Sequence, residues 1–419
     1  MTADEDRIVD LLRRLDPEPV RPVRVDLTAA VHEARRRRRS RRTMSVSAAG
    51  LAVLAAVSVP LVVGGGPWPS AGPASQPASP STSGSASATI VPPATTAPGG
   101  PTACTAQPLP VPGGHAKSLV TGGDPTGRFL AGRSYPGDGR GNPVILWDGD
   151  RAREYRLPGS DQRMVDVNAA GVAVGSVYLD DRPQPYVIRN GRPARLPGLA
   201  SGEATAVSAD GRIVGARQVG DRQRPVLWSD PDTAAVDLPL PGPRWEGTAI
   251  GVDSAGTVVG KIHDGPSGVT RTAVWRAGGA GPELLPAPSV EGGPASEFVA
   301  HSLRGGWITG VAFRDEGKVR RIYPARYHLP TGRYEPLPSG VSPSAGNGRG
   351  WVVGPVDRMD AGLVTDAGTL RLPDLDGRTG RYAALAVSVS DDAGVIGGQL
   401  DVEPGQKGLV MRAIRWSCR

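Results

Sequence analysis

The C-terminal part of this chain repeats one pattern seven times, and the repeat limits the folds that the chain can adopt. A short apolar segment that ends in glycine recurs along the sequence, as in "FLAG", "RIVG" and "WVVG". Successive copies are 43, 40, 45, 50, 44 and 44 residues apart. A period of this size is typical of proteins in which each repeat forms one small sheet. The repeated glycines are Gly132, Gly175, Gly215, Gly260, Gly310, Gly354 and Gly398.

Each repeat predicts four short strands. The unit at residues 204–242 reads "ATAVSADGRIVGARQVGDRQRPVLWSDPDTAAVDLPLPG", in which turn residues such as Asp and Gly separate apolar runs. The third run ends on a large residue in most repeats, and the fourth ends in Leu-Pro. The third-run ends are Trp147, Ile188, Trp228, Trp275, Tyr327, Thr365 and Trp416. The Leu-Pro leucines are Leu157, Leu196, Leu238, Leu285, Leu337 and Leu372.

The last repeat lacks its Leu-Pro run, and the missing run is found before the first repeat. The chain ends just after Cys418, whereas "QPLPVPG" at residues 107–113 precedes the first complete unit. A ring accounts for both facts, because a strand from the N-terminal side can complete the last sheet and remove the free edges. We therefore predict an all-β fold, a seven-bladed β-propeller over residues 104–419, closed by an N-terminal strand.

The two cysteines of the chain fit this closure. Cys104 comes just before the predicted closing strand, and Cys418 comes two residues after Trp416. If the closing strand pairs with the last strand, both cysteines lie at adjoining strand ends, within reach of a disulfide. Such a bond is expected in exported proteins and is rare in the cytosol.

The N-terminal part predicts one membrane helix. Residues 44–66 hold about twenty mostly apolar residues, enough to cross a bilayer, and residues 35–42 before them read "RRRRRSRR". The positive-inside rule then places residues 1–43 in the cytoplasm and the repeats outside. The alternative is a cleaved export signal of the twin-arginine type at Arg41 and Arg42. Residues 67–103 carry no charge and are rich in Pro, Ser, Thr, Ala and Gly, which predicts a disordered spacer.

Two resemblances add to this interpretation. The segments "VNAAGVAVG", "VSADGRIVG" and "VDSAGTVVG", with "TAVW", "PVLW" and "VILW", resemble the HAF-repeat family of extracellular proteins, although the His-Ala-Phe is missing. That resemblance implies propeller-like repeats and no shared enzymatic activity. The cytoplasmic segment resembles those of actinobacterial membrane-anchored anti-sigma proteins, which implies a cytoplasmic partner for residues 1–42. The zinc-binding His and Cys pattern of many such segments is not present.

Charge and motifs exclude several classes of function. Residues 1–42 hold 12 Arg against 8 acidic residues, and no charged residue follows until Lys117. The basic pI therefore reflects a short arginine cluster, so we expect no nucleic-acid binding. The sequence contains no nucleophile elbow, no zinc-protease helix and no Walker loop, and the four exported histidines occupy unlike positions. We predict no catalytic residues, no metal and no cofactor.

One regularity predicts a ligand-binding face. The loop between second and third strands carries aspartate in every repeat, usually with arginine nearby, and these loops should project from one side of the ring. The alternative is that aspartate is simply a favoured turn residue. The candidate residues are Asp138, Asp181, Asp221, Arg222, Asp264, Asp315, Asp357 and Asp401.

The sequence thus favours a membrane-anchored extracytoplasmic propeller that acts as a non-catalytic binding or scaffolding module at the cell surface. Its ligand would be a glycan, a peptide or a protein. The alternative is a transmembrane signalling regulator in which the propeller senses a ligand outside and residues 1–42 bind a sigma factor inside. A third hypothesis is a propeller hydrolase or lyase.

Overall fold

The computed structural model describes residues 99–138, 141–265, 268–317, 319–357, 360–380, 383–402 and 410–419. The predicted cytoplasmic segment, the predicted membrane helix and residues 67–98 of the predicted spacer lie outside the described residues. Within the described part of the chain, no helix has the length and the apolar character needed to cross a membrane.

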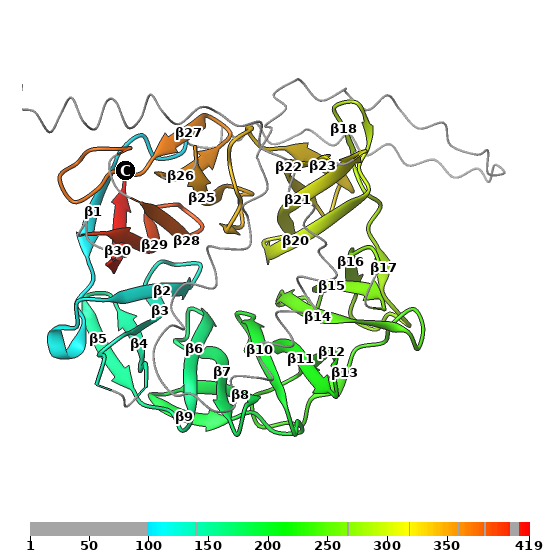
Figure 1. The fold of residues 1–419 in the computed structure, drawn as a ribbon, viewed down its shortest axis with the longest axis horizontal. Coiled ribbons are helices and arrows are strands. Elements are labelled where there is room, and N and C mark those ends of the chain that lie inside the picture. The colour runs from blue at the N-terminus through cyan, green and yellow to red at the C-terminus, as the bar shows by residue number, and fades with distance from the viewer. Residues whose placement is uncertain are drawn as a thin grey trace, which may run out of the picture. The chain divides into compact units, whose positions relative to one another are not determined.

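The described residues form seven four-stranded antiparallel sheets arranged around a common axis, as Figure 1 shows. The predicted seven-bladed, all-β propeller is therefore confirmed. Blade 1 contains β2 (Ser118–Gly123), β3 (Phe129–Ser134), β4 (Val144–Asp148) and β5 (Arg151–Tyr155). Blade 2 contains β6 (Ser160–Val167), β7 (Ala173–Leu179), β8 (Arg182–Arg189) and β9 (Arg192–Arg195). Blade 3 contains β10 (Gly202–Val207), β11 (Ile213–Val219), β12 (Arg222–Trp228) and β13 (Val236–Asp237).

The next three blades follow the same order along the chain. Blade 4 contains β14 (Trp245–Val252), β15 (Val258–Asp264), β16 (Arg271–Trp275) and β17 (Glu283–Leu284). Blade 5 contains β20 (Glu297–Arg304), β21 (Trp307–Glu316), β22 (Val319–His328) and β23 (Arg333–Pro336), and the hairpin of β18 (Ser289–Val290) and β19 (Gly293–Pro294) precedes it. Blade 6 contains β24 (Ala345–Gly346), β25 (Val352–Val356), β26 (Asp360–Thr365) and β27 (Gly368–Arg371).

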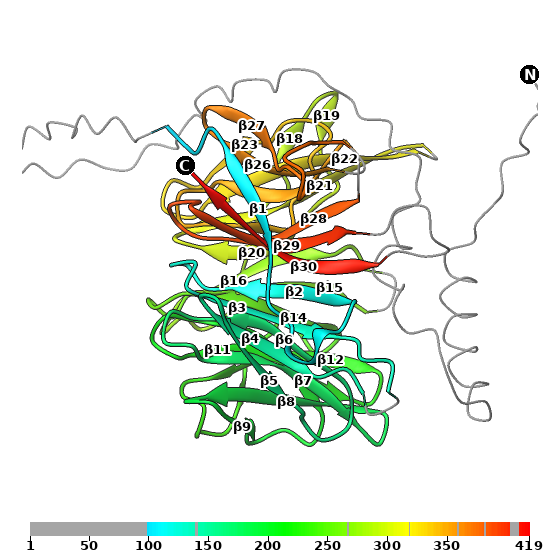
Figure 2. The ribbon, with the colours of Figure 1, turned by 90° about the vertical axis from the view of Figure 1, so that its left-hand side faces the viewer.

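Blade 7 combines strands from both ends of the described chain. Its order is β1 (Cys104–Pro108), β30 (Met411–Cys418), β29 (Val395–Asp401) and β28 (Ala384–Val389). β1 pairs antiparallel with β30 from Cys104 opposite Cys418 to Pro108 opposite Ile414. Figure 2 shows β1 beside β30 from the side of the ring. The outer strand of this blade thus comes from residues that precede blade 1.

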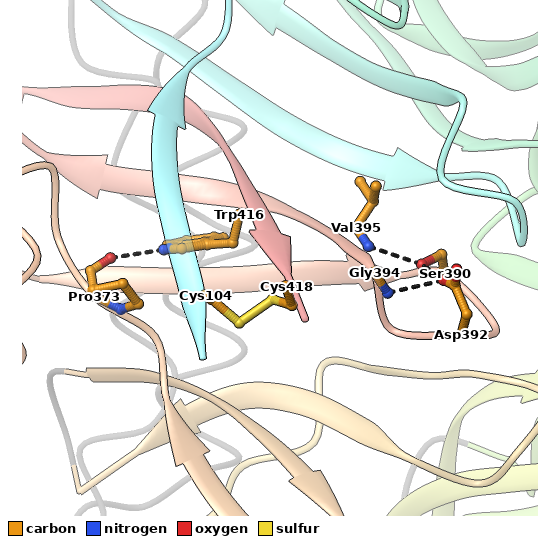
Figure 3. Close-up of a disulfide and its surroundings, with 8 residues drawn as sticks. All are labelled: Cys104, Pro373, Ser390, Asp392, Gly394, Val395, Trp416 and Cys418. Carbon is orange, nitrogen blue, oxygen red and sulfur yellow. Dashed lines mark hydrogen bonds between the residues drawn. A yellow bond between two sulfur atoms is a disulfide. The ribbon is translucent and has the colours of Figure 1, made fainter. Parts of the chain in front are cut away.

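The cysteines are bonded to each other, as the sequence predicted. The Cys104 and Cys418 sulfurs are 2.02 Å apart and join residues separated by 314 positions (Figure 3). Backbone hydrogen bonds continue the β1–β30 pairing beyond the disulfide, because the Arg419 N–H donates to the Ala103 carbonyl at 2.9 Å. The disulfide therefore lies within a regular strand pair rather than bridging two separate loops.

The repeated glycines lie where the second strand passes close to the first strand of the same blade. An ideal Cβ on Gly215 would lie 1.9 Å from the Glu203 carbonyl oxygen, and one on Gly175 would lie 2.0 Å from that of Arg163. Six of the seven repeated glycines meet a first-strand carbonyl in this way, within 2.7 Å, and Gly354 meets the carbonyl of Ser342, just before β24. Any side chain there would push the two strands apart, so the position requires glycine.

The tryptophans and the Leu-Pro runs form one contact between neighbouring blades. The Trp228 indole N–H donates to the carbonyl oxygen of Pro197 at 2.9 Å, and Trp275 donates to that of Pro239 at 2.7 Å. Trp147 and Trp416 make the same bond to Pro110 and Pro373, both at 2.7 Å. In each case the proline follows the leucine of the preceding blade, so this Trp-to-Pro bond joins successive blades. The Trp416 bond is drawn in Figure 3.

The hydrophobic core is divided into layers between the sheets. One layer packs blade 1 residues such as Val144 against blade 2 residues such as Met164 and Ile188. Another layer packs Leu109 and Ala413 of the last blade against Val120 and Trp147 of blade 1. The layers are filled mainly by Val, Ile, Leu and Ala with some Trp, Tyr, Phe and Met, so the core lies between the blades rather than at the axis of the ring. A narrow central channel is left there.

Candidate functional site in the central channel

A cavity of about 160 Å³ lies where the first strands of all seven blades approach the axis of the ring. Small or apolar residues form most of its wall, and three charged or titratable side chains enter it from β6 and β20. Those three residues are Asp166, His301 and Arg304. Hydroxyl groups enter it from β2, β10, β20 and β28 and from the residue before β24. They belong to Thr121, Thr205, Ser302, Ser344 and Ser388.

A β-bulge in six of the seven first strands supplies part of this wall. In β20 the register with β21 shifts between Ala300 and Ser302, which leaves His301 as the extra residue. The same shift leaves Thr121 in β2 and Thr205 in β10. A bulge re-aims side chains and strengthens the local twist, and all three of these residues line the cavity.

The polar bulge residues also join neighbouring blades. The Thr205 hydroxyl donates to the Ala249 carbonyl of blade 4 at 2.7 Å. The Thr121 hydroxyl donates to the Met164 carbonyl of blade 2. His301 donates through Nδ1 to the carbonyl of Pro343, at the entry to blade 6, at 2.7 Å. Because a carbonyl can only accept, the neutral His301 ring has its lone pair on Nε2.

Asp166 departs from the repeat at the position after the bulge. The residue there lies opposite the one that precedes the repeated glycine, and it is small in the other six blades. Those six residues are Gly122, Ala206, Gly251, Ser302, Ala345 and Ser388. In blade 2 the same position holds an aspartate whose side chain is 10% exposed. A carboxylate therefore stands where the repeat otherwise has at most a hydroxyl.

Arg304 departs from the repeat at the first position of the turn. In the other six blades this residue is Asp, Asn or Ser, and its side chain accepts a backbone N–H of its own turn. Asn347, for example, accepts from the Trp351 N–H at 3.0 Å, and Ser390 accepts from that of Val395 at 3.0 Å (Figure 3). The remaining four are Asp124, Asn168, Ser208 and Asp253.

The turn between the first and second strands of blade 5 has no such side-chain acceptor at its first position. Gly305 and Gly306 have φ values of 54° and 82°, which is the backbone of a tight two-residue hairpin turn. Arg304 pairs directly with Trp307 across this turn. The turn needs no side-chain acceptor, so position 304 is free to carry a side chain of another kind.

These two departures meet in one ion pair across the channel. Arg304 Nη2 lies 2.6 Å from Asp166 Oδ1, although the two residues are 138 positions apart. They belong to blades 2 and 5, which are not neighbours in the ring. Asp166 Oδ2 also accepts the Val207 N–H of blade 3 at 2.9 Å. The aspartate is thus held by the backbone N–H groups of Val207 and Val167 and by one charged side chain.

Burial dominates the electrostatics of this site. It raises the pKa of Asp166, and the Arg304 charge opposes the rise. Burial also lowers the pKa of His301, against the hydrogen bond to Pro343, so the imidazole is neutral at pH 7. The Ser388 hydroxyl, also in the cavity wall, is buried and has no hydrogen-bond partner among the described residues. The cavity thus presents one ion pair, one neutral imidazole and one unsatisfied hydroxyl.

A second ion pair joins the beginning of β6 to the beginning of β10. Arg163 of β6 pairs with Glu203 of β10, and the Arg163 Nε also donates to the Ser176 hydroxyl at 3.2 Å. Lys261 of β15 is near enough for its charge to affect His301, and burial lowers the pKa of its ammonium. These groups place further charge beside the channel, on the side of the second-to-third-strand loops.

The eight residues of the predicted aspartate face lie in seven separate loop regions, and the contacts described below are made with neighbouring residues of the same region. All eight residues lie in or beside the connections between second and third strands, so they share one side of the ring. Several of them make local contacts: Asp264 pairs with Arg244 at 3.2 Å, and Asp357 pairs with Arg371. Asp138 lies 3.8 Å from Arg156, Asp315 lies 3.9 Å from Arg320, and Arg222 donates to the Pro243 carbonyl at 3.2 Å.

The remaining members serve the backbone of these connections. Asp181 has a φ of 59° in the β7–β8 turn, and Asp401 accepts the Val410 N–H at 3.1 Å. Asp221 lies in the two-residue turn between β11 and β12. A turn function thus accounts for these three, and the ligand role of the eight residues stays a prediction. Among the described residues, no three His, Cys, Asp or Glu side chains are grouped to hold a metal ion.

The sequence contained the signal for Asp166 and Arg304, although motif searches miss it. When the repeats are aligned on the glycine and the turn before it is allowed to vary by one residue in length, one acidic residue stands in a column of Gly, Ala and Ser, and one arginine in a column of Asp, Asn and Ser. What the alignment does not show is that the two columns face the axis. That follows from the bulges, which have no sequence signature of their own.

Comparison with known proteins supports the fold alone. No protein-family model and no curated protein sequence matches the chain. An oligogalacturonate lyase solved in complex with manganese is 13% identical, with a TM-score of 0.50, and the match covers 77% of this chain and 98% of that one. An oligogalacturonate lyase from Vibrio parahaemolyticus matches over 77% and 98% at 12% identity and a TM-score of 0.47. The propeller domain of the Trilobed protease from Pyrococcus furiosus matches over 72% and 93% at 8% identity and a TM-score of 0.48.

Proposed function

We propose that this protein is an exported, membrane-anchored propeller that binds a small ligand in its central channel without changing it chemically. The observation that carries the proposal is the Arg304–Asp166 pair. A buried ion pair contributes little to stability, because desolvation of both charges offsets their attraction. The other blades form the same strands with small residues and turn caps at these positions. Recognition of a ligand explains why two charges are placed at the axis of the ring.

A binding experiment on the full-length protein in detergent tests the proposal. The panel contains neutral sugars, monocarboxylates, primary amines and amino acids at low millimolar concentration, and the measurement is the thermal unfolding midpoint. We expect at least one class to raise the midpoint of the wild type. The double variant Arg304→Met/Asp166→Asn should lose that response.

A surface ion pair provides the matched control. Arg128 and Asp148 are 2.7 Å apart with exposed side chains, at 61% and 42%, so Arg128→Met/Asp148→Asn removes the same charges outside the channel. This variant should respond to ligands like the wild type. If no class stabilises the wild type, or if both double variants lose the response equally, the channel is not a ligand site.

The non-catalytic part of the proposal is tested on the same samples. Mass spectra of the panel compounds, recorded after overnight incubation with the protein, should show every compound unchanged. A compound that wild type converts and the Arg304→Met/Asp166→Asn variant does not would make the channel an active site of the hydrolase or lyase kind.

The membrane anchor and the direction of export rest on residues 44–66 and on the arginine run before them. The disulfide supports an oxidising compartment for the propeller. Epitope tags at either end test the orientation in intact and permeabilised cells. The C-terminal tag should bind antibody on intact cells, and the N-terminal tag should do so only after permeabilisation; the opposite pattern would overturn the topology.

A further inference from the structure

We infer that the ligand of the channel is a small zwitterion with the size and charge pattern of a free amino acid. The inference rests on the proposed function, since it names the class of ligand for the same cavity. In the bound state the ligand separates the two side chains, its carboxylate accepting from Arg304 and its ammonium group donating to Asp166.

The charge balance of the cavity favours a ligand with both signs. The Arg304 and Asp166 charges cancel in the free protein. A ligand with one charge would take one partner and leave the other ion buried and unpaired, which is strongly unfavourable. A neutral ligand that enters between them would separate the ions without replacing either attraction. A zwitterion gives each ion a new partner of opposite sign, so the exchange leaves no charge uncompensated.

The other polar groups of the cavity suit the same kind of ligand. The Val207 N–H holds Asp166 Oδ2, so the carboxylate keeps its place when Arg304 turns to the ligand. Ser388 offers a buried hydroxyl without a partner among the described residues. His301 Nε2 has no partner there either, and it accepts hydrogen bonds while the ring is neutral. An ammonium group has three N–H donors, so it can be shared between Asp166 and such acceptors.

The size and lining of the cavity limit the rest of the ligand. A volume of about 160 Å³ is close to that of the engineered cavity of about 150 Å³ that holds one benzene molecule. No Phe, Tyr or Trp is among the described residues that line it, so a sugar ring would find no aromatic face to stack on. Val165, Val389 and Leu303 offer an apolar wall for a short aliphatic side chain.

Derivatives that remove one charge at a time test the inference on the unaltered protein. The twenty common amino acids are first compared by thermal unfolding of the full-length protein. Isothermal titration calorimetry then compares the best of them with its N-acetyl derivative, which lacks the ammonium group, and its methyl ester, which lacks the carboxylate. We expect each derivative to bind at least about 100-fold more weakly, because it leaves one buried ion without a partner.

Variants assign the binding to the two side chains. Arg304→Met should abolish binding of the amino acid, and Arg304→Lys should weaken it, since lysine keeps the charge but loses the two-pronged guanidinium. The Arg128→Met/Asp148→Asn surface control should bind like the wild type. Equal stabilisation of wild type, channel variant and control by amino acids would show a general solute effect and overturn the inference.

The outcomes separate this inference from the proposed function. If another class, such as a sugar or a monocarboxylate, stabilises the wild type and fails with the channel variant, the channel binds a ligand but the zwitterion is wrong. If the two singly charged derivatives bind as tightly as the parent amino acid, the charge argument is wrong although the site is real. If no class binds, both the inference and the proposed function fail, and the Arg304–Asp166 ion pair has only a structural role between blades 2 and 5.

Discussion

His301 shows how a single bulged residue connects the channel to the stability of the ring. Its Nδ1–H donates to the Pro343 carbonyl at 2.7 Å, which ties blade 5 to the entry of blade 6. Burial holds the pKa of this imidazole below its ordinary value of 6.5, and the Lys261 charge acts in the same direction. Residue 301 therefore binds a proton less readily in the folded protein than in the unfolded chain.

The sign of the resulting pH dependence follows from linkage. As the pH falls below about 6.5, the unfolded state binds a proton at residue 301 before the folded state does, so unfolding becomes more favourable. The loss grows until the pH reaches the lowered pKa of the folded state. We expect the wild type to lose on the order of 1 kcal/mol of unfolding free energy from this group between pH 7 and pH 5. His301→Gln should remove that component.

Chemical denaturation of both proteins at a series of pH values measures the effect. Asp166 titrates with the opposite sign, because burial raises its pKa and lower pH relieves a buried charge. The difference between the two pH curves, rather than either curve alone, isolates His301. His328→Gln on the outer part of blade 5 controls for the loss of an imidazole as such. Parallel curves for wild type and His301→Gln would contradict the expected effect.

At the scale of elements, the Trp-to-Pro bond explains two sequence features with one contact. The tryptophan ends the third strand of one blade, and the proline follows the fourth strand of the preceding blade. In Trp228 the whole side chain is buried, and the indole N–H reaches the Pro197 carbonyl at 2.9 Å. Neither strand alone requires these residues; the interface between blades does.

Trp228→Phe tests this contact. Phenylalanine keeps most of the apolar volume but removes the 2.9 Å bond to the half-buried Pro197 carbonyl, which then keeps only the longer bond from the Ala235 N–H at 3.4 Å. We expect a loss of about 1 kcal/mol in unfolding free energy for the hydrogen bond, plus the cost of the lost side-chain volume. Denaturant unfolding followed by circular dichroism measures it.

Trp307→Phe is the matched control for that substitution. Trp307 begins β21 and stacks on His328, with ring centroids 4.3 Å apart, and its indole N–H donates to no proline within the described part of the chain. The control should cost clearly less than Trp228→Phe. Equal losses in the two variants would show that the indole N–H contributes nothing beyond ring packing.

The sequence predicts the features that recur in every blade. It does not predict which side chains of the first strands face the axis of the ring. Glycine at 215 and the Leu-Pro run at 196–197 are each imposed by a local contact that recurs in every blade or in most of them, so they produce a visible period. The bulge at His301 produces none, because its register shift is compatible with many residues. Without the bulges, the alternation of the first strands does not show which residues face the axis.

The candidate site was missed for the same reason. The sequence pattern favours the aspartates of the second-to-third-strand loops because they recur in every repeat. A residue that recurs in every repeat is often one that the fold itself requires. Asp181 adopts a positive φ in its turn, and Asp401 accepts a backbone N–H of its own loop. The channel pair is visible as two exceptions to the repeat, Asp166 and Arg304, and their partnership across 138 residues requires the ring.

At the scale of the whole molecule, the ring depends on a strand pair that joins distant parts of the sequence. β1 and β30 are the outer pair of blade 7, and their register runs over five residue pairs. The Leu109 N–H extends the pairing to the Ala413 carbonyl at 2.9 Å, and Pro110 then receives the Trp147 indole of blade 1. Loss of this strand pair would expose the edge of β30 and remove one Trp-to-Pro bond.

The Cys104–Cys418 disulfide fixes this strand pair covalently, and its removal is the test of how much the ring depends on closure. Because the bond closes a loop of 314 positions, it raises the free energy of the unfolded chain by about 6 kcal/mol in the entropic account, and its removal loses that contribution to stability. We expect Cys104→Ser/Cys418→Ser to unfold at a lower temperature and to lose the response to reductant that the wild type shows. Scanning calorimetry of both proteins, with and without dithiothreitol, measures this difference. A wild type whose unfolding temperature does not change on reduction would show that strand pairing and the inter-blade layers hold the ring closed by themselves.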